Sequence, residues 1–537
     1  MSDRDAPART EKLNTKAAGV VGLAVLCSRV LGLVREQIGA ALFGGGWVMD
    51  AFTIAFRIPN LLRDLFAEGA LSTVFTTVFS KTAATDGPDA AWRLANKTWT
   101  LAIIFLSAIT LLGILFSPQL VAALAPGFEG EKAHLTITLT RVMWPFILLV
   151  SLAALAMGML NARNVFGVPA MASSFFNLGS IVFGVGLGWW LDPNFGTRAV
   201  MGLAIGTLVG GALQLFVQLP ALYRQGYVYR PDFAWRDPGV KSIQRLMGPS
   251  VIAGSTTQAN VTINSIFATT AAGNGGVFAL SIAFRLMQLP LGLFGVALST
   301  VSLPLLARMA ALGNLGTFRT ELARGMRLAF LLTIPATVGL IMLAGPIMSV
   351  LYQHHRYDAL QTAQAAGALQ FYALGLAGYA ALKVLVNSFY ALEMRRTPMF
   401  VSLGAVGLNL LLNWIFTLRL GWGVRGLAFS TACIANTNFL ALYLLMWRRL
   451  GRLDTGVMAA MLVRLLPAVL ALMGVCWAGL HFVLADWATQ EFWSKLAWLT
   501  ATIVIGAAVF LGGAVVMRVA EMDQLVGVVK RRFNRGR

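Results

Sequence analysis

The sequence predicts an all-α polytopic membrane protein with about fourteen transmembrane helices. Of its 537 residues, 58% are hydrophobic and only 12% are charged, too few charges to cover a soluble protein of this length. Long stretches such as 101–116, 330–343 and 496–511 are continuously apolar. The strands of a transmembrane barrel would instead alternate apolar and polar residues. Helices are therefore expected, because they satisfy their own backbone hydrogen bonds in lipid.

The predicted spans account for most of the chain. In order they are 15–40, 50–80, 98–118, 136–160, 170–191, 199–222, 248–272, 277–306, 327–352, 364–392, 398–418, 424–446, 459–484 and 496–518. An even number of spans places both termini on the same side of the membrane.

The distribution of basic residues predicts which side that is. The chain has 42 Lys and Arg residues and a net charge of +20. In a soluble protein this charge would suggest a nucleic-acid partner. Here most basic residues lie in short segments that face the cytoplasm if the N-terminus does, and few lie in the outer loops. We therefore expect cytoplasmic termini, an inner-membrane location and no nucleic-acid partner.

An internal repeat predicts two similar halves. Residues 55–74 carry Ala-Phe-Arg, then Leu-Phe, then Ala-Leu-Ser-Thr-Val, and residues 283–301 carry the same three groups in the same order. Six predicted spans separate the copies, so both have the same orientation, as in transporters built from parallel repeats with the substrate site between them. Chance similarity between Leu- and Ala-rich helices is the alternative interpretation.

The predicted organisation follows from the repeat and from a turn-rich linker. It comprises a cytoplasmic tail (1–14), an N-terminal six-helix lobe (15–222), a cytoplasmic linker (223–247), a C-terminal six-helix lobe (248–446), a cytoplasmic loop (447–458), transmembrane helices 13 and 14 (459–518) and a basic cytoplasmic tail (519–537).

Arginines occur within the predicted spans. Arg29 and Arg35 lie in the first span, Arg57 and Arg63 in the second, and Arg285 in the eighth. Each costs about 2.5–3.5 kcal/mol at a helix centre on insertion scales. A water-filled cavity facing an anionic ligand would explain them, because the planar guanidinium group binds phosphate through two hydrogen bonds.

Two observations weigh against a simple cavity. Arg35 and Arg57 lie near span ends, where their side chains could reach the headgroups instead. Arg29 and Arg35 are separated by six residues, or about 600° of helix. Their convergence on one ligand would require a bend, which Gly32 would permit, or a wide cavity.

Acidic residues are scarcer in the spans. Asp50 and Glu68 bracket the charged part of the second span, and Arg63 could pair with Asp64 or with Glu68. Asp50 could hold an ammonium group, couple to a cation or mark the start of a helix. The histidines form no metal-binding set, so we expect no metal and no cofactor. Dependence on the membrane potential or on a coupling cation stays open.

These residues resemble motifs of the MurJ (MviN) family, the lipid II flippases of the multidrug/oligosaccharidyl-lipid/polysaccharide exporter superfamily. The resemblance covers roughly residues 15–520. It is carried by Ser-Arg-Val-Leu-Gly-Leu-Val-Arg at 28–35, Asp-Ala-Phe at 50–52, Phe-Arg-Ile-Pro-Asn-Leu-Leu-Arg at 56–63, Leu-Phe-Ala-Glu-Gly-Ala at 65–70, Ala-Pro-Gly-Phe at 125–128, and Arg-Leu-Met at 285–287.

The resemblance implies two six-helix lobes around a central cavity, with two C-terminal helices forming a groove for a lipid tail. It implies transport of lipid II to the outer leaflet by alternating access, not an enzymatic reaction. Membrane lipids are further implied partners, and the peptidoglycan synthesis machinery is a candidate one. The implied substrate-binding residues are Arg29, Arg35, Arg63 and Arg285 for the pyrophosphate, together with Ser28, Arg57, Asp50 and Glu68.

The chain departs from the family pattern near the eighth-span arginine. Family members commonly carry an acid immediately before it and often another three residues after it, whereas this chain has Phe284 and Gln288. Some relatives bind sodium through an aspartate in span 7, but residues 248–272 contain no carboxylate. The resemblance therefore argues against sodium coupling by that route and for different pairing of Arg285.

Other functions are weaker alternatives. An exporter of another polyprenyl-linked glycan, such as O-antigen units, would share the arginines. A cationic-drug exporter should line its cavity with acids instead. A membrane glycosyltransferase would need an acid or metal set on an outer loop, and the acids there form no motif. They are Glu129, Glu131, Asp192, Asp486 and Glu491.

Overall fold

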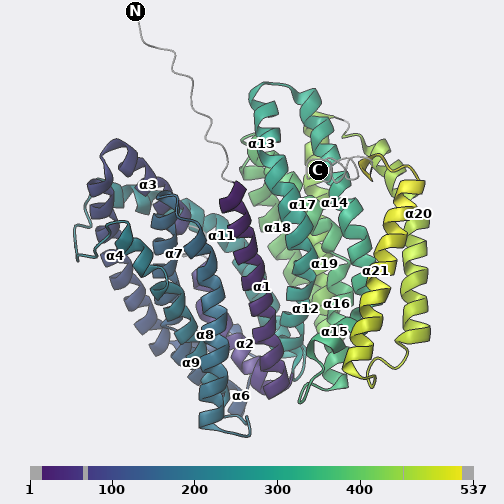
Figure 1. Cartoon of the computed structure of the whole chain (residues 1–537), viewed down its shortest axis with the longest axis horizontal. Coiled ribbons are helices and arrows are strands. Elements are labelled where there is room, and N and C mark those ends of the chain that lie inside the picture. Colours follow the sequence, from purple (N-terminus) through teal and green to yellow (C-terminus); the bar gives the residue numbers. More distant parts are fainter. Residues whose placement is uncertain (1–14, 65–70, 452, 523–537) are drawn as a thin grey trace, which may run out of the picture. The chain divides into compact units, whose positions relative to one another are not determined.

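The computed structural model describes residues 15–64, 71–451 and 453–522 (Figure 1). These residues form helices joined by short loops, and no strand occurs among them. The chain divides into two compact units. Of the described residues, unit 1 contains 15–38, 55–64, 71–118 and 137–254, and unit 2 contains 39–54, 119–136, 255–451 and 453–522.

The helices confirm the predicted all-α polytopic class. Within the described residues, ten helices are long and apolar enough to cross a membrane. The bent pair α16 (Ala359–Ala373) and α17 (Leu376–Ala391) makes an eleventh if it forms one span. The predicted spans 15–40, 50–80 and 248–272 are not among these, although the described residues of each are helical. These three segments carry the arginines of the first two spans and the Ser, Thr, Asn and Gln residues of the seventh.

Unit 1 is built from the first half of the helices. They are α1 (Thr15–Phe43, to residue 38), α2 (Trp47–Arg63, from residue 55), α3 (Ser72–Thr85), α4 (Pro88–Leu115), part of α6 (Gly130–Met143), α7 (Phe146–Ala162), α8 (Gly167–Leu191), α9 (Val200–Phe216), α10 (Leu219–Arg224) and the start of α11 (Pro238–Ala271). Pro88 occupies the first turn of α4, where its missing N–H costs nothing.

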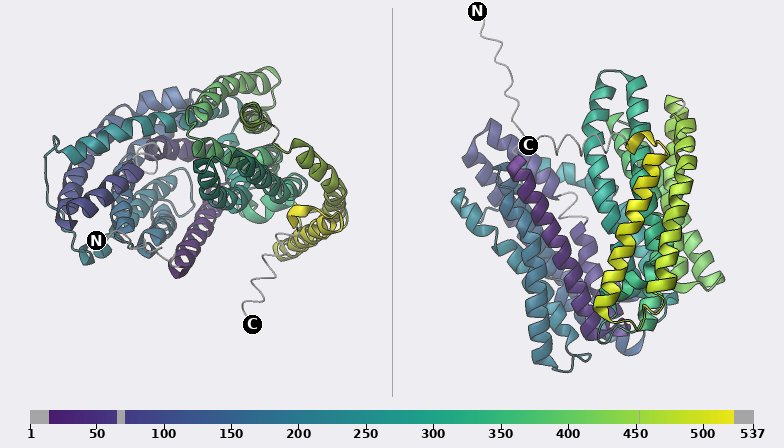
Figure 2. Two further views of the ribbon diagram at one scale, coloured as in Figure 1. Left: turned by 90° about the horizontal axis from the view of Figure 1, so that it is seen from above. Right: turned by 45° about the vertical axis from the view of Figure 1, so that its right-hand side comes forward.

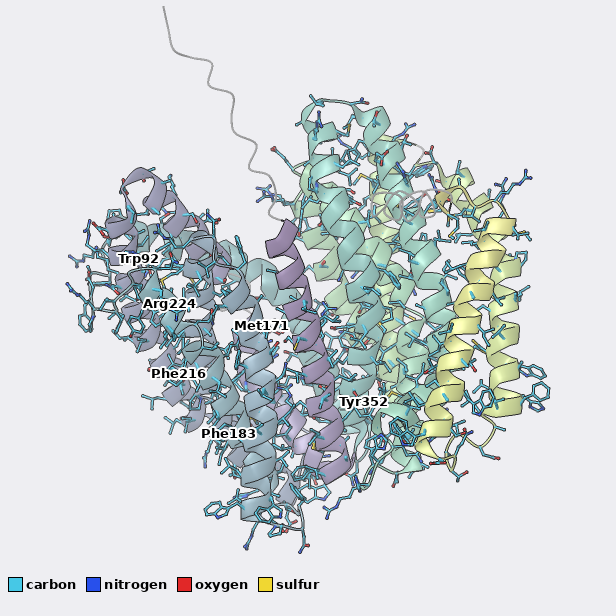
Figure 3. The ribbon with its side chains drawn as sticks, in the orientation of Figure 1. Trp92, Met171, Phe183, Phe216, Arg224 and Tyr352 are labelled. Atoms are coloured by element: carbon cyan, nitrogen blue, oxygen red, sulfur yellow. The ribbon has the colours of Figure 1, made fainter. Side chains whose placement is uncertain are left out.

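Glycines allow α8 and α9 to pack closely. A Cβ on Gly202 would lie 2.2 Å from the backbone nitrogen of Gly188, and a Cβ on Gly206 would lie 2.5 Å from Gly184. Small residues at such helix contacts let the two backbones approach, as is common in membrane proteins. The outer faces of the same helices carry exposed apolar side chains such as Phe183 and Phe216, as expected of a surface in contact with lipid (Figure 3).

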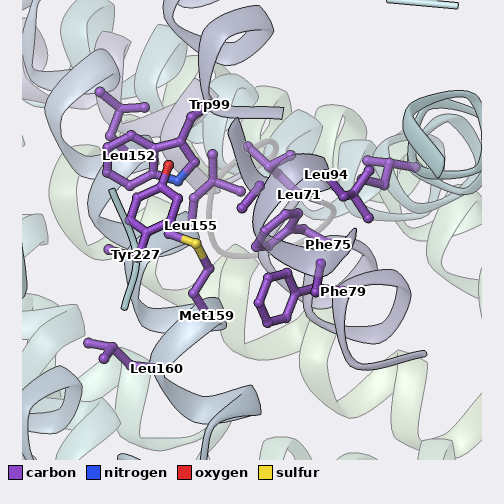
Figure 4. Close-up of a cluster of buried hydrophobic side chains, with 14 of the residues drawn as sticks. Leu71, Phe75, Phe79, Leu94, Trp99, Leu152, Leu155, Met159, Leu160 and Tyr227 are labelled. Carbon is purple, nitrogen blue, oxygen red and sulfur yellow. The ribbon is translucent and has the colours of Figure 1, made fainter. Parts of the chain in front are cut away.

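The core of unit 1 lies among α3, α4, α7 and the segment after α10. Phe75 and Phe79 of α3 pack with Leu155 and Met159 of α7 (Figure 4). Tyr227 from the predicted linker belongs to the same cluster. The linker is therefore fastened to unit 1 by buried aromatic contacts.

Unit 2 contains the remaining helices. They are the end of α1 and the start of α2, α5 (Ser117–Leu124, from residue 119), the start of α6, the second half of α11, α12 (Gly276–Pro290), α13 (Ala297–Ala311), α14 (Leu315–Met342), α15 (Ala344–Tyr352), α16, α17, α18 (Arg396–Asn413), α19 (Gly423–Leu450), α20 (Thr455–Ala478) and α21 (Phe492–Val516). The predicted eighth span is α12, a π-helical turn (Leu291–Val296) and α13. Pro290 stands where the helix changes type, since a proline removes a backbone hydrogen bond.

Helices α20 and α21 pack side by side on α14 and α15 through a shared apolar cluster (Figure 2). At one end of this hairpin the buried Lys495 donates a hydrogen bond to Ser349 Oγ at 2.6 Å. At the other end Arg327 forms an ion pair with Glu521. Polar contacts at both ends thus fix the two C-terminal helices to unit 2.

Candidate functional site

Arg29 lies on a helix that is held in place by its neighbour. Asn177 of α8 donates a hydrogen bond to the backbone oxygen of Ser28 at 3.0 Å and contacts Ser28 Oγ at 3.5 Å. One turn earlier, Ser174 of α8 donates to the backbone oxygen of Ala24. These contacts fix one face of α1. The side chain of Arg29 is exposed, near the middle of a 29-residue helix.

Arg35 has a different environment from Arg29. Its guanidinium carbon lies 5.0 Å from the ring centre of Phe176 and 5.8 Å from that of Phe56. Phe146 packs against both rings. Cation–π contacts of this kind hold a guanidinium group in apolar surroundings. Helix α1 runs without interruption through Gly32, so no helix break brings the two arginines together.

Arg63 is paired locally. Its Nη2 lies 2.9 Å from Asp64 Oδ1, and its Nε donates to the same oxygen at 3.2 Å. Both side chains are half-buried. The predicted pairing of Arg63 with Asp64 is thus present. Arg57 is half-buried on α2, and Glu68 lies outside the described residues.

Asp50 forms a junction that we call the Asp50 junction, made with Lys132, Gly275 and Phe278. The carboxylate is completely buried, with an exposed fraction of 0%. It accepts hydrogen bonds from Lys132 Nζ at 2.8 Å, from the backbone N–H of Gly275 at 2.7 Å and from that of Phe278 at 2.9 Å. Asp50 therefore caps the start of α12, and it also lies in the first turn of its own helix, α2.

The Asp50 junction is chemically favourable. The first N–H groups of α12 have no partners within the helix, and the positive end of the helix dipole attracts a carboxylate. Lys132 adds a charge-assisted bond. Lys132 Nζ also lies 4.1 Å from the ring centre of Phe128.

Three glycines let other segments close around the Asp50 junction. Gly275 has a φ of +80°, and a Cβ there would lie 1.9 Å from the backbone oxygen of Gly45. A Cβ on Gly45 would lie 2.5 Å from the ring of Tyr357, and one on Gly127 would lie 2.1 Å from the backbone oxygen of Thr269. Backbone segments from four parts of the chain thus meet in unit 2.

Arg285 lies on the helix that Asp50 caps. It is half-buried and ten residues beyond Gly275, or about 15 Å along α12. The preceding Phe284 packs against Tyr372 at 5.3 Å between ring centres, and Gln288 is exposed. Of the two residues that depart from the family pattern, Phe284 makes a packing contact and Gln288 presents an exposed amide.

The predicted site residues divide between the two units. Ser28, Arg29, Arg35, Arg57 and Arg63 belong to unit 1, whereas Asp50 and Arg285 belong to unit 2. Within unit 2 the structure links Asp50 to the helix that carries Arg285. A common cavity for all the arginines stays a prediction.

Two groups of polar residues escaped the sequence analysis. Lys132 lies in the predicted outer loop between the spans 98–118 and 136–160, and no local pattern connects it with Asp50. A cluster of four amides joins α11 and α18, with Asn409 and Asn413 fully buried and Asn260 and Asn264 half-buried. Asn409 Nδ2 donates to Asn260 Oδ1 at 2.8 Å, Asn413 Nδ2 donates to Asn264 Oδ1 at 2.8 Å, and Asn413 also donates to Asn409 at 2.7 Å. The spacing of four residues in both helices places each pair on one face and could have predicted the cluster.

Comparisons with known proteins give a consistent result. Residues 39–497 match the family described as Lipid II flippase MurJ. A lipid II flippase MurJ of Burkholderia cenocepacia is 34% identical over 494 residues, covering 91% of this chain and 94% of the relative. A probable lipid II flippase MurJ of Vibrio cholerae is 34% identical, covering 80% and 82%.

Solved structures share the fold. A lipid II flippase MurJ in an inward closed conformation has a TM-score of 0.73 and 23% identity, covering 92% of this chain and 99% of that one. An inward-facing multidrug resistance MATE transporter of the MOP superfamily has a TM-score of 0.59 and 19% identity, covering 81% and 95%. Because the family's pattern matches residues 39–497 and a relative covered over 94% of its length is 34% identical, the chain belongs to the MurJ family.

Proposed function

We propose that this chain is a flippase that moves lipid II from the cytoplasmic to the outer leaflet of the bacterial inner membrane by alternating access. It is a transporter and not an enzyme. Family membership and the names of its relatives support this function. The observation in the structure that supports it is an exposed arginine, Arg29, in the middle of an apolar helix.

The orientation proposed is the one with both termini in the cytoplasm. Under it, the segments around Gly45, Gly127, Gly275 and Tyr357 all belong to outer loops. The contacts at the Asp50 junction require these four segments to be on one side of the membrane. The charge distribution and the contacts therefore support the same topology.

The Asp50 junction serves as the outer latch. Asp50 and Lys132 belong to the predicted N-terminal lobe, and Gly275 and Phe278 belong to the predicted C-terminal lobe. Separating them would uncover a carboxylate, an ammonium group and the start of α12. The Asp50–Lys132 pair lies within one lobe and stays together, but the two backbone hydrogen bonds from Gly275 and Phe278 are lost, and a hydrogen bond to a charged group contributes about 1.5–3 kcal/mol. Outward opening therefore has to offset this contact, and substrate binding can supply the energy.

Helix α12 links the latch to the substrate. Its first turn is held by Asp50, and Arg285 follows about 15 Å further along. A shift of the helix that seats a pyrophosphate on Arg285 would move the capped end as well. We propose that this rigid connection transmits substrate binding to the outer latch.

The pyrophosphate is held chiefly by Arg29 and Arg285. Arg35 supplies positive charge from a position fixed by Phe176 and Phe56, and Arg63 contributes less because Asp64 balances its charge. Ser28 helps to position α1. Arg57 and Glu68 stay predicted members of the site. The membrane potential or a coupling cation drives transport, and the lipid tail and the synthesis machinery are further contacts.

A second candidate function is export of another polyprenyl-linked glycan. The observation that favours it is the replacement of the acids around Arg285 by Phe284 and Gln288. Both substrates would present a phosphate-linked polyprenol to the same arginines, so the two functions differ in the recognition of the sugar.

The experiment that separates them uses a bacterium depleted of its own flippase. The chain is expressed there, and lipid II reaching the outer leaflet is measured by its accessibility to an externally added enzyme. We expect externalisation to be restored. A correctly inserted chain that restores O-antigen export in a corresponding mutant, but not lipid II externalisation, would contradict the proposal.

A further inference from the structure

Two side chains of α8 hold the backbone of α1. Helix α8 lies beside α1 (Figure 1) and donates hydrogen bonds to the backbone oxygens of Ala24 and Ser28. The donors are Ser174 and Asn177, which are only 4% and 7% exposed. We call the contact between Asn177 and Ser28 the α1 clamp, and it determines how α1 is rotated about its own axis.

The contacts with α8 follow one face of α1. Ala24 and Ser28 are about one turn apart, and Arg35 follows Ser28 by seven residues, or about 700° of helix, which is close to two full turns. The three residues therefore share a face. In agreement, the guanidinium carbon of Arg35 lies 5.0 Å from the ring centre of Phe176, the residue before Asn177 on α8.

Arg29 lies outside this face. As the residue after Ser28, it is turned by about 100° around the helix axis. Its side chain is exposed, and within the described residues the structure gives it no hydrogen bond and no ion pair. The direction of Arg29 therefore depends on the rotation of α1, and the α1 clamp fixes that rotation one residue away.

Unit 2 contains the same kind of clamp without an arginine. Asn409 of α18 donates to the backbone oxygen of Asn260 on α11 at 3.3 Å and to its Oδ1 at 2.8 Å. Asn177 likewise donates to the backbone oxygen of Ser28 and contacts its hydroxyl. In both units 149 residues separate donor and acceptor. The residue after Asn260 is Val261, so this second clamp orients no charge.

We propose that Asn177 is a positioning residue for Arg29. By holding Ser28 against α8, it keeps α1 at the rotation that directs Arg29 toward the pyrophosphate of the polyprenyl substrate. Asn177 acts through Arg29 and does not contact the substrate. The inference rests on the function proposed above, in which Arg29 binds that pyrophosphate. It adds an uncharged residue of the fifth predicted span to those on which substrate recognition depends.

The test measures lipid binding to the purified full-length chain in detergent by native mass spectrometry. The two probes are undecaprenyl pyrophosphate and undecaprenol, which share the polyprenyl tail and differ in the headgroup. Asn177→Leu removes the donor of the α1 clamp. Asn409→Leu removes the corresponding donor in unit 2 and is the matched control. Melting temperatures check folding, and Asn177→Ala replaces Asn177→Leu if the larger side chain prevents folding.

The two variants should differ in binding although both lose a contact between helices. Asn177→Leu should weaken the binding of undecaprenyl pyrophosphate about fivefold, as expected for the loss of one hydrogen bond, and leave that of undecaprenol unchanged. Asn409→Leu should leave both affinities unchanged while lowering the melting temperature. A purely structural role of Asn177 would make the two variants alike.

A double-mutant cycle separates positioning from a direct contact with the substrate. Arg29→Ala should weaken the binding of undecaprenyl pyrophosphate about tenfold or more, because it removes a charge-assisted hydrogen bond. Adding Asn177→Leu to Arg29→Ala should weaken binding no further, since no guanidinium group is left to position.

Equal binding of undecaprenyl pyrophosphate by folded Asn177→Leu and the unaltered chain would overturn the proposal. A full additional loss in the Arg29→Ala background, or an equal loss for undecaprenol, would also overturn it. Unchanged binding by Arg29→Ala would instead contradict the proposed function, because Arg29 would then not hold the pyrophosphate. The two failures are therefore distinguishable.

Discussion

The first helix and the Asp50 junction treat charge in opposite ways. On α1, the backbone is held by Asn177 and Ser174 while the side chain of Arg29 is exposed. At the Asp50 junction, the carboxylate is fully buried and receives three hydrogen bonds. A charge in apolar surroundings is unfavourable in both places. The charge of Asp50 is compensated by partners within the protein, whereas the charge of Arg29 is available to water or a ligand. A charge without an internal partner indicates binding, and a saturated one indicates a structural contact.

The largest effect on stability is expected when Asp50 is replaced. Asp50→Ala should lower the free energy of unfolding by about 3–5 kcal/mol, because Lys132 and the first turn of α12 lose their buried partner. The measurement is thermal unfolding of the detergent-purified chain. Lys132→Met breaks the same charged pair but leaves both backbone bonds, so any additional loss in Asp50→Ala measures those two bonds. Equal stability of Asp50→Ala and the unaltered chain would show that the Asp50 junction holds nothing together.

Glycine substitutions test how tightly the Asp50 junction is closed. Gly273 and Gly275 both have positive φ values, +71° and +80°, but only Gly275 has backbone within 4 Å of a Cβ, at 1.9 Å from Gly45. Gly273→Ala should cost about 1 kcal/mol from backbone strain alone. Gly275→Ala should cost more, because the loop at Gly45 has to move. Cysteine labelling near Gly45 from the outer side should increase only for Gly275→Ala. Equal melting temperatures and labelling for the two variants would contradict this.

The ion pair between Lys97 and Asp237 gives a smaller, pH-dependent effect. Burial alone would raise the pKa of Asp237, but hydrogen bonds from Lys97 and from the backbone of Gly239 outweigh it and lower the pKa. A lowered pKa in the folded state adds stability at neutral pH that is lost as the pH falls through the folded-state pKa. Asp237→Asn should therefore cost about 1 kcal/mol near neutral pH. The difference should begin to shrink as the pH falls below about 4, near the ordinary pKa of aspartate, and should vanish only below the lowered pKa of the folded state.

The measurement is the melting temperature of the chain and of Asp237→Asn between pH 3 and pH 8. A difference that stays constant over this range would show that the interaction does not depend on the charge of Asp237.

The smallest effect on stability is expected at Arg29. Arg29→Ala should change the free energy of unfolding by less than about 0.5 kcal/mol, because the side chain is exposed and its helix is fixed by backbone contacts. Thermal unfolding checks this directly. A loss as large as that of Asp50→Ala would place Arg29 among the structural charges.

The sequence predicted what depends on local pattern. Apolar runs predicted the helices, and the neighbouring acids Asp64 and Glu68 were the two candidate partners for Arg63, of which Asp64 is paired with it. The Asp50 junction was beyond local reasoning, because 225 residues separate Asp50 from Gly275 and no periodicity connects them. The internal repeat indicated that the two halves have the same orientation, but it did not indicate which residues of the two halves are in contact. The amide cluster was accessible in principle, since Asn260, Asn264, Asn409 and Asn413 repeat at helical spacing.

The most direct test of the central claim compares two arginines in cells depleted of their own flippase. Arg29→Ala and the control Arg198→Ala, an exposed residue outside the predicted site, are expressed at equal levels. We predict that Arg198→Ala restores externalisation of lipid II, and that Arg29→Ala inserts and melts normally but does not restore it. Normal externalisation by Arg29→Ala would contradict the account.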